Sequence, residues 1–164
     1  MTEFDRKDLR NAFGRFMTGV TIVTARTNDG QPVGFTANSF TSVSLDPPLL
    51  LVCPSRKLSS FETFSQCSHF AVNILADDQQ AVSDTFACYD GDRFERVAHH
   101  AGPEGLPLIN GASAQFSCAT HQIIPAGDHC ILLGEVIAFE HRDAGCLGYA
   151  RGAYFTLTQR ATAA

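Results

Sequence analysis

The stretch that decides the fold is Val20-Thr21-Ile22-Val23-Thr24-Ala25, followed by Asn28-Asp29-Gly30 and a second strand from about Val33. Residues branched at the β-carbon favour extended backbone, so the first run predicts a strand. The Asn-Asp-Gly sequence is a turn signal between two strands. The stretch therefore predicts a β-hairpin.

Outward from this hairpin, the chain alternates further strands with a few short helices. The segment Leu49–Cys53, after the turn Asp46-Pro47-Pro48, is expected to be a fully buried strand. Later strands are expected at 70–75, 114–121, 131–140 and 154–158. The strands follow one another through hairpin-like turns and not through regular helices, which favours an antiparallel barrel over a doubly wound parallel sheet.

Three helices are expected from apolar spacing and capping signals. An apolar stripe predicts a helix over Asp5–Met17. A capping box of Ser59 and Glu62 is expected to open a helix that runs to Phe64, and Asp77 to cap one that runs to about Phe86. The polar stretch 88–106 is expected to be a long loop with one turn of helix. Together, six or seven strands and these short helices predict a mainly β fold. The chain is expected to form one domain over residues 1–164, with its core at about 10–158.

Composition excludes several classes of function. The 164 residues carry a formal net charge of −5, and no basic face suits a nucleic acid or a membrane surface. No apolar run approaches a transmembrane length, and the first residues do not resemble a signal peptide, so a cytoplasmic protein is expected. The closest of the six cysteines, Cys118 and Cys130, are too far apart for a C-x-x-C pair; reduced cysteines and no metal site are expected.

The segment Gly34–Pro48 is the richest in polar chemistry. If it is extended throughout, one face carries Thr36, Asn38, Phe40, Ser42 and Ser44, and the other carries Phe35, Ala37, Ser39, Thr41, Val43 and Leu45. The first face is almost a row of hydroxyls and amides. It could be the solvated face of an edge strand, or a polar wall that lines a planar ligand.

A second polar segment, Ser55–Glu62, places Arg56, Lys57 and three hydroxyls before an expected helix. A helix start offers free N–H groups to a phosphate, although a plain cap with exposed basic residues would have the same pattern. The two segments together suggest a ligand with a flat polar ring and a phosphate tail. Neither a G-x-G-x-x-G nor a P-loop motif is present.

The tripeptide Gly127-Asp128-His129 forms a turn before a strand. A single histidine in such a place is more often structural or exposed than functional. The tripeptide is nevertheless one of the segments that carry a family resemblance.

Several segments together resemble the short-chain flavin reductases, the flavin reductase-like proteins with an FMN-binding split barrel. They are Phe13–Thr24, Gly34–Pro48, Phe70–Leu75 with Gln79, Asp92-Arg93-Phe94 and Gly127-Asp128-His129. The resemblance runs from about Phe13 to Leu157. It implies a homodimer of antiparallel, Greek-key-like split β-barrels with the flavin in a cleft near the dimer interface.

The resemblance also implies roles for individual residues. The flavin ring would lie beside Thr36, Ala37, Asn38 and Ser39, with Ser42, Val43, Ser44 and Cys53 close to it. The flavin phosphate would lie at Arg56, Ser59 and Ser60. His129 and Tyr154 would lie beside the nicotinamide, with His129 as the one catalytic candidate.

The activity implied is that of an NAD(P)H:flavin oxidoreductase, which reduces FMN or FAD with NADH or NADPH and supplies reduced flavin to a partner monooxygenase. The flavin carries the redox chemistry, while the protein binds and orients it. Two alternatives remain open at this point: an electron-transfer protein that keeps its FMN, and a split-barrel binding module with no redox role.

Overall fold

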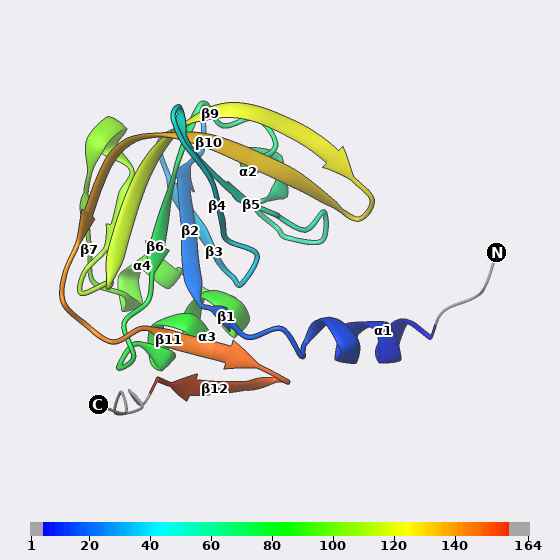
Figure 1. The fold of residues 1–164 in the computed structure, drawn as a ribbon. Helices are drawn as coiled ribbons and strands as arrows, with labels where there is room; N and C mark the ends of the chain where they lie inside the picture. Colours follow the sequence, from blue (N-terminus) through cyan, green and yellow to red (C-terminus); the bar gives the residue numbers. More distant parts are fainter. Residues whose placement is uncertain (1–4, 158–164) are drawn as a thin grey trace.

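The structure is a computed structural model that describes residues 5–157 (Figure 1). In this part of the chain four α-helices accompany twelve strands. The helices are α1 (Arg6–Phe13), α2 (Phe61–Phe64), α3 (Gln80–Cys88) and α4 (Arg93–Arg96), with a 3-10 turn, η1, at Pro103–Gly105. The strands are β1 (Thr18–Gly19), β2 (Thr21–Arg26), β3 (Pro32–Ala37), β4 (Thr41–Leu45), β5 (Pro48–Val52), β6 (His69–Ile74), β7 (His99–Ala101), β8 (Pro107–Ile109), β9 (Ala114–Ala126), β10 (His129–His141), β11 (Leu147–Ala150) and β12 (Ala153–Thr156).

Seven strands form one antiparallel sheet in the order β3-β2-β6-β9-β10-β5-β4. Its two outermost strands, β3 and β4, are consecutive in the chain and are joined only by residues 38–40. Because so short a link keeps its ends close, the sheet must curl until its two edges come near each other. These edges do not pair, so the barrel stays split along the line between β3 and β4. The antiparallel split barrel expected from the sequence is confirmed.

The barrel is filled by side chains of its own strands and of α2. Phe64, from α2, is fully buried and packs edge-to-face on Phe35 of β3, with ring centroids 4.8 Å apart. Phe70 is buried in the same cluster. Burying an aromatic side chain of this size stabilises the fold by about 1.5–3 kcal/mol.

A second cluster lies at one end of the barrel, where α3 and the small sheet β1-β11-β12 sit together in Figure 1. It is built around Ile22, Leu75, Phe86, Ile109 and Leu147. Gly34 of β3 is part of this packing, because a Cβ atom there would stand 2.8 Å from the Phe86 ring. The absence of a side chain at Gly34 therefore lets α3 lie directly on β3.

The segment 34–48 is not one extended strand, so the continuous alternation expected from the sequence is wrong. The chain leaves β3 after Ala37, bends at 38–40 and starts β4 at Thr41. The pairing of β4 with β5 then shifts register between Ser42 and Ser44. The physical reason is closure of the sheet, since the chain has to pass from one edge to the other within this segment.

Several local expectations are also corrected. β5 alternates between buried and partly exposed residues and is not fully buried. Neither expected cap forms: α2 begins after Ser60 without a side-chain cap, and α3 begins after Gln79, also without one. Residues 88–106 contain the expected turn of helix as α4, but they also hold β7 and η1 and are not otherwise one long loop. The strand expected at 154–158 is β12, which ends at Thr156; Thr158 lies outside the described residues.

Helix α1 is shorter than expected and none of its residues is buried. Asp5 caps it, since the Asp5 carboxylate accepts hydrogen bonds from the backbone N–H of Lys7 and Asp8. The helix projects from the barrel on the same side as the tip of the β9–β10 hairpin (Figure 1). Within residues 5–157, its apolar stripe therefore has no cover.

Candidate functional site

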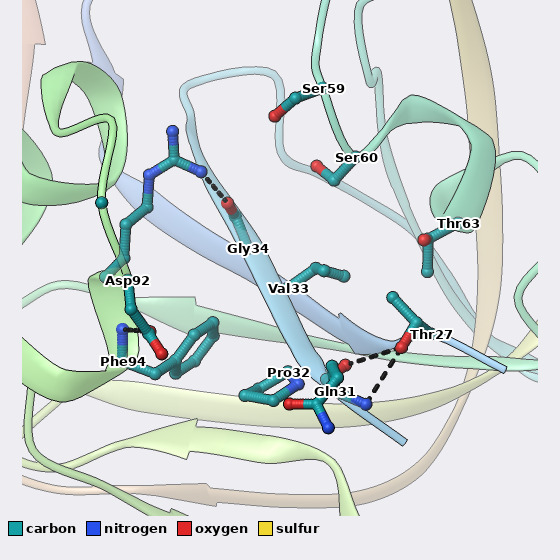
Figure 2. A pocket seen from close by; sticks show the side chains of 12 residues that line it. Thr27, Gln31, Pro32, Val33, Gly34, Ser59, Ser60, Thr63, Asp92 and Phe94 are labelled. Carbon is teal, nitrogen blue, oxygen red and sulfur yellow. Dashed lines mark hydrogen bonds between the residues drawn. The ribbon is translucent and has the colours of Figure 1, made fainter. Parts of the chain in front are cut away.

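A cavity of about 370 Å³ lies along β3, between α2 and α4. Figure 2 shows Ser59, Ser60 and Thr63 on one side of β3, and Asp92 and Phe94 on the other. Hydroxyl groups therefore line one wall of the cavity. The opposite wall belongs to the start of α4, which brings Arg93 to the same space.

Arg93 supplies the positive charge of this cavity. Its Nε donates to the backbone oxygen of Tyr89 at 3.1 Å, and its Nη1 lies 3.5 Å from the backbone oxygen of Gly34. The neighbouring Asp92 carboxylate is turned toward the start of α4, where it accepts from the N–H groups of Phe94 and Glu95. Within residues 5–157, no carboxylate lies within salt-bridge distance of Arg93. Hydroxyl donors facing a free guanidinium suit a phosphate group.

Ser59 and Ser60 line this cavity as the sequence predicts, but the physical reason differs. Helix α2 has only four residues, so its dipole contributes little to anion binding. The Ser60 hydroxyl makes no capping hydrogen bond. The affinity of this wall for an anion therefore depends on the hydroxyl groups.

Arg56 is held elsewhere and is not among the residues that line the cavity. Its Nε donates to the backbone oxygen of Gly127 at 3.1 Å, and its guanidinium lies 5.5 Å from the centre of the Phe61 ring. The backbone N–H of Arg56 also donates to the oxygen of Asp128 at 2.9 Å. Arg56 thus fastens the tip of the β9–β10 hairpin to the segment before α2.

A second cavity, of about 210 Å³, brings Thr36, Ala37 and Asn38 together with Tyr149 and Tyr154. A chain of hydrogen bonds fixes its wall. The Thr36 hydroxyl donates to the backbone oxygen of Ser83 at 2.7 Å, and the Ser83 hydroxyl lies 2.9 Å from the Tyr154 hydroxyl. Tyr154 in turn donates to the Asp84 carboxylate at 3.0 Å.

The two tyrosine rings of this cavity pack edge-to-face, with centroids 5.3 Å apart. Partial burial raises the pKa of the Tyr154 phenol, so the group stays protonated and keeps its hydrogen bond to Asp84 at neutral pH. The structure therefore joins two parts of the expected site, Thr36–Asn38 and Tyr154, that are far apart in the sequence.

Ser39 and Cys53 meet at the split in the barrel. The backbone N–H of Cys53 donates to the Ser39 hydroxyl at 3.0 Å, which ties the β3–β4 link to the end of β5. Burial raises the pKa of the Cys53 thiol, so it is protonated at neutral pH and a poor nucleophile. Ser39 thus has a structural task in addition to any contact with a ligand.

Three of the expected site residues, Ser42, Val43 and Ser44, line neither cavity. Ser42 and Val43 are exposed on β4. The Ser44 hydroxyl accepts from the backbone N–H of Asp46, which supports the turn before β5. Their place beside a flavin stays a prediction.

His129 stands at the first position of β10, as expected for a histidine that follows a turn. Its Nδ1 lies 2.8 Å from the Asp128 carboxylate, and 43 % of its side chain is exposed. The hydrogen bond to His129 lowers the pKa of the Asp128 carboxyl. An ionised Asp128 accepts from Nδ1–H, which leaves Nε2 of the imidazole free for a ligand.

No role was expected for Arg93, although Asp92-Arg93-Phe94 is one of the segments that carry the family resemblance. No local pattern marks Arg93, because its place in the cavity depends on the contact of α4 with Gly34 of β3. The other unassigned residues, Ser83 and Asp84, give no local signal either, because their contacts with Tyr154 are made across 70 residues or more.

Among residues 5–157, no three His, Cys, Asp or Glu side chains are grouped so that they could hold a metal ion. In the same part of the chain, no helix is long and apolar enough to cross a membrane.

The chain is similar to proteins that reduce flavins. A "Probable flavin reductase" of Rhizobium meliloti is 52 % identical over 93 % of this chain and 49 % of its own length. The "Flavin-dependent trigonelline monooxygenase, reductase component" of Acinetobacter baylyi is 50 % identical over 99 % of this chain and 54 % of its own length. The chain thus spans about half the length of these relatives.

Solved structures show the same fold. The NADH:FAD oxidoreductase SgcE6 of Streptomyces globisporus, in complex with NAD and FAD fragments, superimposes with a TM-score of 0.89 at 38 % identity. The alignment covers 98 % of this chain and 99 % of that one. The family model described as "Flavin reductase like domain" matches residues 13–158. Sequence and fold agree, and this chain belongs to the flavin reductase like domain family.

Proposed function

We propose that the protein is an NAD(P)H:flavin oxidoreductase that reduces FMN or FAD. The observation that carries the proposal is the arrangement along β3. One part of this strand, at Gly34, borders a cavity with hydroxyls and a guanidinium, and the next part, at Thr36–Asn38, borders a cavity with two tyrosines. Gly34 and Thr36 are two residues apart, about 7 Å along a strand. A ring with a phosphorylated tail fits along this edge.

The residues present suit a flavin by the chemistry of their donors. Thr36, Ala37, Asn38 and Ser39 offer hydroxyl, amide and backbone groups to the polar edge of a ring. Ser59, Ser60 and Arg93 hold the phosphate through neutral donors and one positive charge. A flavin held by these residues would supply the hydride-accepting chemistry, with NADH or NADPH as the hydride donor.

The chain's own part in this reaction is to bind and orient. Tyr154, fixed by Ser83 and Asp84, forms an aromatic wall beside Thr36–Asn38. His129 positions the nicotinamide, or supplies a proton from Nε2–H when its imidazole carries both protons, since Asp128 holds its Nδ1. No residue need act as a nucleophile, in keeping with the protonated state of Cys53.

The reduced flavin passes by diffusion to a flavin-dependent monooxygenase. Support comes from the relative of Acinetobacter baylyi, which is the reductase component of such an enzyme. A cytoplasmic location suits this role, because NAD(P)H is available there.

The protein works as a homodimer. Phe13, Phe16 and Met17, in α1 and just after it, are 71 %, 77 % and 67 % exposed, and Leu45 of β4 is 95 % exposed. An apolar helix face that no other part of the described chain covers calls for a partner, and a twofold dimer is the commonest solution. Light scattering of Phe16→Asp should give a monomer, while Phe139→Asp, which changes an equally exposed phenylalanine near the far end of β10, should leave the dimer intact. A monomeric wild-type protein with full flavin affinity would refute the proposal.

The reductase activity is tested by anaerobic oxidation of NADH and NADPH with FMN, FAD and riboflavin added in turn. The expected result is oxidation of the nucleotide only when a flavin is present. A protein that purifies yellow and does not reduce added flavin would be an electron-transfer flavoprotein. Oxidation at the background rate with every flavin would leave only a binding module, and the proposal would fail.

A further inference from the structure

The cavity along β3 that Ser59, Ser60 and Arg93 line is called the phosphate cavity below. A groove of about 300 Å³ adjoins it on the side away from Arg93. The two spaces share Thr27, Ser59 and Thr63 as lining residues. The groove then extends between the β2–β3 turn and the end of α2. Its further lining includes Arg26, Asn28, Asp29, Glu62 and Gln66. The cavity and the groove therefore adjoin along these three residues, so one extended ligand could lie across both.

The groove has its own positive charge. The Arg26 guanidinium is anchored by two backbone oxygens, those of Gly30 at 2.6 Å and of Gly105. Backbone carbonyls hold the group in place without cancelling its charge. In residues 5–157 no carboxylate comes within salt-bridge distance of it. The connected space therefore has one unpaired guanidinium in each part, Arg93 in the cavity and Arg26 in the groove, with the hydroxyls of Ser59 and Thr63 common to both.

This arrangement matches two linked phosphates better than one. FMN has a single phosphate, which the cavity can satisfy through Ser59, Ser60 and Arg93, and it leaves the groove with Arg26 empty of ligand. A dinucleotide has a second phosphate that can reach Arg26. Each space is of the size of an ordinary small-molecule site, for which about 300 Å³ is the lower bound.

The remaining side chains of the groove suit an adenosine. Asn28 and Gln66 carry amides, the groups that pair in bidentate fashion with the N6 and N7 positions of adenine. Asp29 and Glu62 carry carboxylates, which accept hydrogen bonds from ribose hydroxyls. None of these four side chains is required by the barrel core, since all four are exposed.

We infer that this groove binds the adenylate half of FAD, so that the protein favours FAD over FMN. The inference rests on the proposed flavin site, which fixes the first phosphate. The adenylate of NADH has the same chemistry. Continuity with the flavin phosphate cavity favours FAD, and the experiment separates the two dinucleotides.

The test compares Gln66→Ala with Gln80→Ala. Gln80 is an exposed glutamine at the start of α3 that lines neither space, so it controls for the loss of a surface amide. Dissociation constants for FAD, FMN and riboflavin are measured by flavin fluorescence, and KM for NADH is measured with riboflavin as the acceptor. Asn28→Ala, on the opposite wall of the groove, provides a second variant.

Wild-type protein should bind FAD more tightly than FMN. Gln66→Ala should weaken FAD by at least about fivefold, the low end for a bidentate pair between an amide and adenine. FMN, riboflavin and KM for NADH should not change, and Gln80→Ala should change nothing. Asn28→Ala should repeat the selective loss of FAD.

Equal effects of Gln66→Ala and Asn28→Ala on FAD and FMN, or no effect on either, would overturn the inference while flavin reduction stands. A higher KM for NADH with unchanged FAD binding would assign the groove to the nicotinamide dinucleotide instead. A wild-type protein that binds no flavin at all would overturn the proposed function and this inference together.

Discussion

Replacing Arg93 by alanine is the most direct test of where the flavin phosphate lies. Arg93 is the guanidinium of the phosphate cavity, and Gly34 and Tyr89 occupy only part of its donor capacity. A hydrogen bond to a charged group is worth about 1.5–3 kcal/mol. Losing it should raise the dissociation constant for FMN by about 10- to 150-fold. Riboflavin has no phosphate, so its affinity should change much less.

The assay is a fluorescence titration of FMN and of riboflavin against wild type, Arg93→Ala and Arg96→Ala. Arg96 is the matched control, because it lies one turn later in α4, is exposed and stacks on the Tyr89 ring at 3.8 Å from its centre. The ratio of the FMN to the riboflavin constant isolates the phosphate, since any general damage to the cavity affects both ligands. The difference in affinity between FMN and riboflavin should also become smaller as salt is added, because salt screens the attraction between the phosphate and Arg93.

Two results would refute this reasoning. If Arg93→Ala weakens FMN and riboflavin by the same factor, Arg93 shapes the cavity and does not bind the phosphate. If Arg56→Ala causes the larger selective loss of FMN, the phosphate lies beside Arg56, at the tip of the β9–β10 hairpin, as the sequence alone suggests.

Three further predictions concern catalysis, packing and pH. His129→Ala should lower kcat/KM for NAD(P)H by about 5- to 150-fold, with flavin affinity and melting temperature unchanged because the ring is 43 % exposed; unchanged kinetics would remove His129 from the site. Gly134→Ala should lower the free energy of unfolding by about 1–3 kcal/mol, because the new Cβ would overlap the Phe70 ring and stand 2.8 Å from the Cys118 Cβ. Gly19→Ala is the control: its Cβ would meet nothing within 4 Å, so the melting temperature should not change. Burial raises the pKa of the Cys118 thiol from its ordinary value of 9.0 to about 12. The contribution of this thiol to stability is therefore complete below pH 9.0 and is lost as the pH rises toward about 12. Urea unfolding between about pH 8 and about pH 11 should therefore show a steeper loss for wild type than for Cys118→Ala, by up to about 1.4 kcal/mol per pH unit, and equal slopes would contradict the assignment.

Local patterns predict the strands of this fold well, because the signals that form a hairpin lie within a few residues of one another. The hairpin of β2 and β3 is found where Val20–Ala25 and Asn28-Asp29-Gly30 place it. Its antiparallel pairing, repeated by β9 and β10, also follows from turns that are visible in the sequence.

Long-range contacts decide the rest, and the sequence does not report them. The bend at 38–40 exists because β3 and β4 stand at opposite edges of a curled sheet, a property of the whole barrel. The start of α2 is set by successive tight turns, in which Leu58 bonds back to Ser55 and Phe61 to Leu58, in place of a capping side chain.

Some of the expected site residues come together as predicted and others do not, because the site also depends on long-range contacts. Ser59 and Ser60 line a cavity, and Thr36–Asn38 meet Tyr154, as the resemblance implies. The guanidinium in that cavity is Arg93 and not Arg56, because which distant segment approaches β3 depends on the packing of α3 and α4.

The tyrosine pair beside Thr36–Asn38 gives the molecule an optical property of its own. The chain has no tryptophan and only three tyrosines, so its ultraviolet emission comes from these rings. Two of the three, Tyr149 and Tyr154, line the cavity where the flavin ring is proposed to lie. The absorption spectrum of a flavin bound there overlaps the emission of both tyrosines. Energy transfer to the flavin should therefore quench most of the protein's fluorescence. The tyrosine emission of the unlabelled protein thus reports whether the flavin site is occupied. Tyr154→Phe should reduce the loss of emission on flavin binding by about half, because one of the two tyrosines in the cavity is then missing.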